Sequence, residues 1–215
     1  MRPKSLACDM PAMPCTTESR IIGAINIFSD KSTPPVVSIN STSITTGLPS
    51  FDLSFSSIEN TVMAAGVSSR SVLITGVGII GLMAVSVARA AGASQIVVTD
   101  TNPQRLKLAQ ALGADEAFRA DDPDWLQQAQ QLSHGQGPEV LLEMSGHPQA
   151  IRDGFQALAN GGTAALLGLP TEPISFDLPN DIIFKGAKVL GINGRRMFDT
   201  WYQMERFLLA GRLDL

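Results

Sequence analysis

The sequence has no run of about 18 uninterrupted apolar residues, so no segment of it is predicted to span a membrane. The first residues include the basic Arg2 and Lys4 but no continuous apolar core behind them, a pattern unlike that of a secretory signal. Cysteine is scarce, with only Cys8 and Cys15, and a reducing cytoplasm disfavours a disulfide between them. We therefore expect a cytoplasmic protein whose cysteines are free thiols.

Basic side chains are also too few to dominate the charge of the protein. The 16 lysines and arginines are outnumbered by 20 aspartates and glutamates, which gives a net charge of -4. Such a chain offers no electrostatic footprint for nucleic acid or for an anionic membrane, so neither is expected as a partner. The hydrophobic content of 44% excludes wholesale disorder, and 215 residues suffice for one domain with a sizeable core, or for one domain plus an extension.

The chain divides near residue 70 into two parts of different character. Residues 1–66 are rich in serine and threonine, contain scattered prolines, and carry short apolar runs without sustained alternation or clear hairpin turns. We predict a partly ordered N-terminal extension there, and the sequence gives no indication of its function. Residues 67–215 have a regular pattern and are predicted to form a single domain.

In this second part, short apolar runs alternate with stretches that favour helix, as a doubly wound α/β parallel sheet requires. Six strands are predicted, at Val72–Thr75, Gln95–Thr99, Glu116–Phe118, Val140–Glu143, Thr163–Leu167 and Lys188–Ile192. Helices are predicted at Ile80–Ala91, Pro103–Leu112, Pro123–Leu132, Pro148–Ala159 and Thr200–Ala210. This number of strands and crossover helices matches a Rossmann fold, with the expected strand order 3-2-1-4-5-6 and right-handed crossovers. A ligand is then expected across the carboxyl ends of strands one and four.

A glycine motif directly follows the first predicted strand. Gly76, Gly78 and Gly81 have the spacing G-x-G-x-x-G, a helix-forming stretch comes next, and Asp100 ends the second strand. Together these features are typical of a dinucleotide-binding site. The first glycine allows a tight turn, the second lets the backbone approach a pyrophosphate, and the third lets helix and strand pack closely. The phosphates are expected at the free N–H groups and positive dipole end of the helix.

Asp100 also predicts which dinucleotide is bound. Its carboxylate is placed to accept hydrogen bonds from the ribose hydroxyls of adenosine, whereas a 2′-phosphate there meets like charge. The sequence therefore predicts NAD rather than NADP as the cofactor.

Several segments beyond the glycine motif resemble the cofactor domain of the zinc-dependent medium-chain dehydrogenases, the alcohol dehydrogenase family, and within it the branch of L-threonine 3-dehydrogenases. These segments are residues 98–106, 142–146, 165–170, 183–186 and 191–202. The most diagnostic is the Met-Phe-x-Thr-Trp-Tyr run that ends at Tyr202, and the resemblance covers about residues 67–215. It implies an oxidoreductase that uses NAD to oxidise a secondary alcohol, threonine or a similar small molecule, to a ketone.

The resemblance also implies roles for cofactor-binding residues beyond Gly76, Gly78, Gly81 and Asp100. In the family, the residue at Ile80 packs on the adenine or ribose, and Arg105 helps to hold the adenosine half. The nicotinamide half is expected to meet Leu167, Gly168, Leu169, Ile192 and Asn193, the last in place of a tyrosine common in the family. The alternative is structural: Leu167, Leu169 and Ile192 close the core, and Arg105 is a solvated charge.

The family's zinc, which binds the substrate hydroxyl and lowers its pKa, has no evident ligands here. In the family, Cys, His and Glu or Asp ligands come from a catalytic domain that precedes the cofactor domain. This sequence has no Gly-His-Glu run, and its only histidines, His134 and His147, lie in predicted loops of the cofactor domain. Two cysteines also cannot form the four-cysteine structural zinc site of many relatives. We therefore expect no metal site and assign no catalytic residue.

Three functional hypotheses remain open: an NAD-dependent dehydrogenase, a non-catalytic NAD-binding module or truncated remnant, and a cofactor domain completed by a partner chain. We expect the chain alone to bind NAD and to turn over little or nothing.

A short-chain dehydrogenase needs Tyr-x-x-x-Lys, but the only tyrosine, Tyr202, is followed four residues later by Arg206. The complete three-glycine spacing argues against a methyltransferase. By resemblance, the last strand is an expected surface for forming a homo-oligomer.

Overall fold

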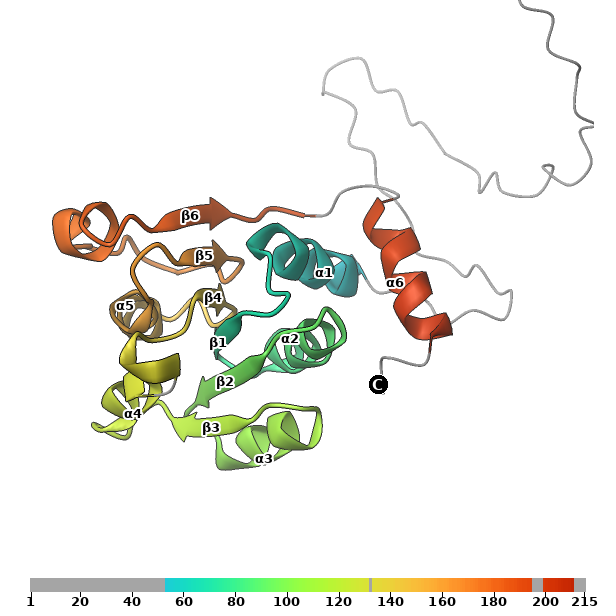
Figure 1. Ribbon diagram of the computed structural model, residues 1–215, viewed down its shortest axis with the longest axis horizontal. Coiled ribbons are helices and arrows are strands. Elements are labelled where there is room, and N and C mark those ends of the chain that lie inside the picture. The colour runs from blue at the N-terminus through green and yellow to red at the C-terminus, as the bar shows by residue number, and fades with distance from the viewer. Residues whose placement is uncertain (1–52, 132, 195–198, 211–215) are drawn as a thin grey trace, which may run out of the picture. The chain divides into compact units, whose positions relative to one another are not determined.

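The computed structural model of the protein describes residues 53–131, 133–194 and 199–210 (Figure 1). Both cysteines and most of the predicted extension lie outside the described residues. The strands are β1 Ser71–Thr75, β2 Gln95–Asp100, β3 Glu116–Arg119, β4 Val140–Glu143, β5 Thr163–Leu166 and β6 Lys188–Gly191. The α-helices are α1 Leu53–Ala65, α2 Ile79–Ala90, α3 Pro103–Ala111, α4 Trp125–Gln131, α5 Pro148–Ala157 and α6 Asp199–Leu209.

The six strands form one parallel sheet in the order β3-β2-β1-β4-β5-β6, which confirms the predicted Rossmann topology. β1 lies at the point where the strand order reverses, and it pairs in parallel with β2 on one side and β4 on the other. Thr75, the last residue of β1, is level with Thr99 and with Glu143. The carboxyl ends of these three strands therefore meet at one edge of the sheet.

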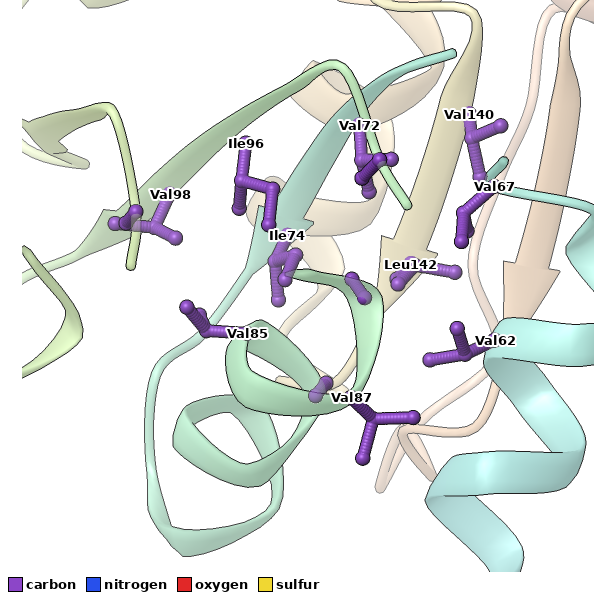
Figure 2. Close-up of a cluster of buried hydrophobic side chains, with 14 of the residues drawn as sticks. Val62, Val67, Val72, Ile74, Val85, Val87, Ile96, Val98, Val140 and Leu142 are labelled. Carbon is purple, nitrogen blue, oxygen red and sulfur yellow. The ribbon is translucent and has the colours of Figure 1, made fainter. Parts of the chain in front are cut away.

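Helices cover both faces of the sheet, so the central strands are buried on both sides. Side chains alternate between the two faces along β1: Val72 and Ile74 belong to one apolar cluster, and Leu73 belongs to the other. Figure 2 shows the first cluster, in which residues of α1 and α2 pack on the sheet. The second cluster includes residues of α4 and α5 on the opposite face. Burial on both faces explains why the central strands are continuous apolar runs.

The helix α1 was not predicted from the sequence, although it lies inside the region described above as an extension. Its residues Ile58, Val62 and Ala65 are buried in the first cluster, and the helix packs against α2, β4 and β5. Their spacing is helical, but the serine, asparagine and threonine residues among them obscure the apolar stripe. A 3₁₀ turn at Ser133–Gly135 and a π-helical turn at Pro179–Ile183 were also not predicted.

Glu59 in α1 is an acid in an apolar setting. Its side chain is fully buried, and neither carboxylate oxygen has a hydrogen-bond partner among the described residues. Burial raises the pKa of Glu59 to about 7.

The described part of the chain contains no helix long and apolar enough to cross a membrane.

Candidate functional site

The glycine loop begins where β1 ends. Gly76 has a φ of +82°, in the left-handed region, and a Cβ built on it would lie 2.6 Å from Cβ of Ser145. Both the backbone conformation and the space therefore require glycine at this position. The Gly76 N–H donates to the carbonyl oxygen of Thr99 at 2.8 Å, which ties the start of the loop to β2.

The other two glycines of the motif differ in what surrounds them. A Cβ on Gly81 would lie 2.0 Å from the carbonyl oxygen of Gly76, so the first turn of α2 contacts the loop directly. By contrast, a Cβ on Gly78 would meet no atom within 4 Å. Gly78 is the N-cap of α2, and no side chain caps this helix. The first N–H groups of α2 thus face open space at Gly78, as an anion-binding helix terminus requires.

Asp100 is the last residue of β2 and lies beside the glycine loop. Only 8% of the residue is exposed. Its Oδ2 accepts a hydrogen bond from the Val77 N–H at 2.9 Å, and its Oδ1 accepts one from the Asn102 N–H at 2.8 Å. The first of these bonds connects the acid to the glycine loop across 23 residues of sequence. The structure therefore brings together the two parts of the predicted motif.

Arg105 lies close to this acid. Its Nη1 is 3.8 Å from Oδ2 of Asp100, and its side chain is about half exposed. Arg105 stands in the first turns of α3, which Asn102 caps by accepting hydrogen bonds from the N–H groups of Gln104 and Arg105. The charge is thus paired with Asp100 while part of the guanidinium remains open to solvent.

The residues expected to meet nicotinamide follow β5 and β6. Leu167 and Ile192 are partly buried against the first apolar cluster, as the structural alternative expected. Leu169 is 88% exposed, so it does not close the core. Asn193 is exposed. Gly168 is partly buried, and a Cβ built on it would lie 2.3 Å from Oε2 of Glu143, so only glycine fits there.

Ile80, in the first turn of α2, is 38% exposed, and Ile79 before it is 73% exposed. Exposed large apolar side chains beside a glycine loop offer contact area to a ligand. Both follow the glycine loop at the carboxyl end of β1.

Sequence reasoning did not select Glu143 and Ser145 as site residues. Glu143 is fully buried at the end of β4, and its Oε1 accepts hydrogen bonds from Ser145 N at 2.9 Å and from Ser145 Oγ at 2.5 Å. The available signal was an acid that ends an apolar strand, because a buried carboxylate needs specific donors around it.

The described residues do not form a zinc site. No group of three or more His, Cys, Asp or Glu side chains among them is arranged to hold a metal ion. His134 and His147 are both exposed and lie on different loops. This part of the chain therefore does not supply the ligand set that the family's zinc requires.

Comparisons with known proteins identify the family. The sequence model of the zinc-binding dehydrogenases matches residues 80–210. The chain is 48% identical over 158 residues to an L-threonine 3-dehydrogenase from Bacillus velezensis, a match that covers 74% of this chain and 44% of that protein. An L-threonine 3-dehydrogenase from Bacillus subtilis is 42% identical over 156 residues, which covers 73% of this chain and 45% of that protein.

A solved structure, benzyl alcohol dehydrogenase from Acinetobacter calcoaceticus, superimposes with a TM-score of 0.66 at 27% identity and covers 74% of this chain and 45% of that one. This chain thus spans a little under half the length of the curated relatives that it matches. The family model covers β2 to β6 and most of α2, which are among the elements that build the site described above. The chain belongs to the zinc-binding dehydrogenase family.

Proposed function

We propose that this chain supplies the NAD-binding domain, beginning near residue 67, of an L-threonine 3-dehydrogenase-like oxidoreductase that oxidises a secondary alcohol to a ketone. The observation that carries the proposal is the hydrogen bond from Val77 N–H to Asp100, because it joins the phosphate-binding loop to the ribose-binding acid. The relatives named L-threonine 3-dehydrogenase support the substrate class, threonine or a similar secondary alcohol.

The adenosine half is assigned to Asp100, Arg105 and Ile80. Each oxygen of Asp100 accepts one backbone hydrogen bond, which leaves each a lone pair for a ribose hydroxyl. Because the acid is nearly buried, a 2′-phosphate beside it would be repelled with little screening by water. This favours NAD over NADP. The pyrophosphate is assigned to Gly76, Gly78 and Gly81 with the N-terminus of α2.

The nicotinamide half is assigned to Leu167, Gly168, Leu169, Ile192 and Asn193. Leu169 presents an apolar surface to solvent at the end of β5, and Asn193 adds a polar side chain near the end of β6. NAD, when bound, supplies the hydride acceptor. The role of the residues named here is to bind the cofactor and to fix the orientation of its ring.

We further propose that this chain alone turns over little or no alcohol. The support is the lack of a metal-binding group among the described residues. The same observation favours a second candidate function, a non-catalytic NAD-binding module or a cofactor domain completed by a partner chain. Addition of NAD, zinc and L-threonine to the purified chain tests this proposal, because NADH forms only if the chain completes a catalytic site by itself.

A second copy of the chain is a further proposed partner, through β6. This strand is an edge of the sheet and pairs only with β5 among the described strands. Val189 on it is 41% exposed, and an unpaired apolar edge is a template for pairing with another chain.

The test of the cofactor proposal is a titration of the purified chain with NADH and with NADPH, followed by nicotinamide fluorescence. We expect NADH to bind at least about tenfold more tightly, and Asp100→Ser to remove most of this preference. Equal binding of both cofactors by the unaltered protein would contradict the role of Asp100. Failure of a folded protein to bind either one would refute the proposed function.

A further inference from the structure

Glu143 lies at the reversal point of the sheet and is fully buried. Every group that donates to its side chain is neutral. The Ser145 N–H, the Ser145 hydroxyl and the Gly146 N–H donate to Oε1 at 2.9, 2.5 and 3.0 Å, and the Thr75 hydroxyl lies 3.5 Å from the same oxygen. These donors come from the loop after β4 and from the end of β1. One carboxylate therefore connects two adjacent strand ends.

The same residue also holds the turn that follows β5. The backbone carbonyl of Glu143 accepts hydrogen bonds from the N–H groups of Leu167 and Gly168, both at 3.0 Å. A Cβ on Gly168 would be 2.3 Å from Oε2, so the turn rests directly on the carboxylate. Gly146, with a φ of +65°, approaches the turn as closely, because a Cβ on it would lie 2.6 Å from the carbonyl oxygen of Leu169.

Ser145 extends the contact to the glycine loop. A Cβ built on Gly76 would lie 2.6 Å from the Cβ of Ser145, so the two residues are in close contact. The hydroxyl and N–H of Ser145 donate to Glu143. The loop assigned to the pyrophosphate thus contacts Ser145, which donates to Glu143, and the turn assigned to nicotinamide rests on Glu143 itself.

We propose that Glu143 is a positioning residue for cofactor binding, which holds the turn 167–169 in register with the glycine loop so that the turn meets the nicotinamide half of the dinucleotide while the loop holds its pyrophosphate. The inference rests on the proposed NAD-binding function. It assigns Glu143 no contact with the reacting atoms.

The chemistry of the side chain explains why an acid is required. A carboxylate only accepts hydrogen bonds, so it suits a cluster in which every neighbour donates. The Gly146 N–H also donates to Oε2 at 3.3 Å, so a glutamine with its amide oxygen in place of Oε1 would turn its NH₂ group toward this N–H. The unmatched pair of donors would displace the loop after β4 and the turn resting on it. Asp100 and Arg105 contact Glu143 in none of the hydrogen bonds described, so the adenosine end of the site stays in place.

The experiment compares Glu143→Gln with the unaltered protein in binding two ligands, NADH by fluorescence and AMP by calorimetry. AMP probes only the adenosine end. We expect Glu143→Gln to weaken NADH binding about tenfold, the effect of one lost charge-assisted hydrogen bond, and to leave AMP binding unchanged. Glu59→Gln is the matched control, since it changes the fully buried acid of α1 in the same way.

Ser145→Ala is the second variant, for use if Glu143→Gln does not fold. It keeps the acid but removes the hydroxyl that donates to Oε1. Weaker NADH binding with unchanged AMP binding in either folded variant supports the inference. Unchanged NADH binding, or an equal loss for both ligands, overturns it and leaves Glu143 a purely structural residue. If the unaltered protein binds neither ligand, the proposed function itself fails, which is a separate result.

Discussion

The buried acid of α1 makes the stability of this protein depend on pH. The pKa of Glu59 rises from 4.5 in the unfolded chain to about 7 in the folded one, because burial disfavours the charged form. The folded state therefore holds a proton that the unfolded state releases. Below pH 4.5 the group has no effect on stability. As the pH rises from 4.5 to 7, the free energy of unfolding falls. Above pH 7 the full loss is present.

The size of this loss follows from the shift. A rise of the pKa from 4.5 to about 7 corresponds to at most about 3–4 kcal/mol, since one pKa unit is about 1.4 kcal/mol. Glu59→Gln keeps the shape of the side chain but has no proton to lose. We compare the free energy of unfolding of this variant with that of the unaltered protein. The difference in favour of the variant should be up to about 3 kcal/mol larger at pH 8 than at pH 4.5.

Urea unfolding at pH 4.5, 5.5, 6.5 and 8, followed by tryptophan fluorescence, measures this difference. Trp125 is only 4% exposed and is a suitable probe of unfolding. Glu172→Gln, which removes an exposed carboxyl, controls for the change in net charge. Parallel pH profiles for the Glu59→Gln variant and the unaltered protein would refute the reasoning, because they would show that Glu59 is charged at no extra cost in its folded site.

Four further substitutions test the site and its support. Gly81→Ala should lower stability and abolish NADH binding, because a Cβ at this position has no room. Gly78→Ala, where a Cβ has room, should leave the melting temperature unchanged and weaken NADH binding about tenfold. Lys185→Met should lower the free energy of unfolding by about 1–3 kcal/mol in urea titrations, since Nζ donates to three carbonyls at the end of α5. Val189→Glu should give a monomer in light scattering where the unaltered protein gives a dimer, and an unaltered monomer contradicts pairing through β6.

The sheet and the motif residues of the candidate site were predictable from the sequence because local patterns specify them. An apolar run that is buried on both faces, as in β1, reads as a strand without reference to the rest of the chain. The glycine spacing likewise reflects one tight turn after β1, and Asp100 reflects the dinucleotide that the site is proposed to bind. The bond between Val77 and Asp100 follows from the parallel pairing of β1 with β2 once the strand order is known.

The features that were not predicted depend on distant contacts. The apolar stripe of α1 is short, and its helix becomes evident only when α2 and β5 cover Ile58 and Val62. Glu143 ends an apolar strand, and nothing in its immediate sequence shows that its carboxylate will support a turn after β5. The exposure of Leu169 was also undecided by sequence, because a leucine after a strand is equally consistent with a core residue and a ligand contact.

The packing of α1 sets where the protein can be cut. A fragment that starts at residue 67 keeps every strand and the whole glycine loop but loses the helix that covers part of one face of the sheet. Leu142 of β4 and Ala165 of β5 would then lose the apolar cover that α1 provides. A fragment that starts at residue 53 retains this cover. For expression of the cofactor domain alone, the preferred first residue therefore lies before α1 rather than at the start of the recognisable sequence pattern.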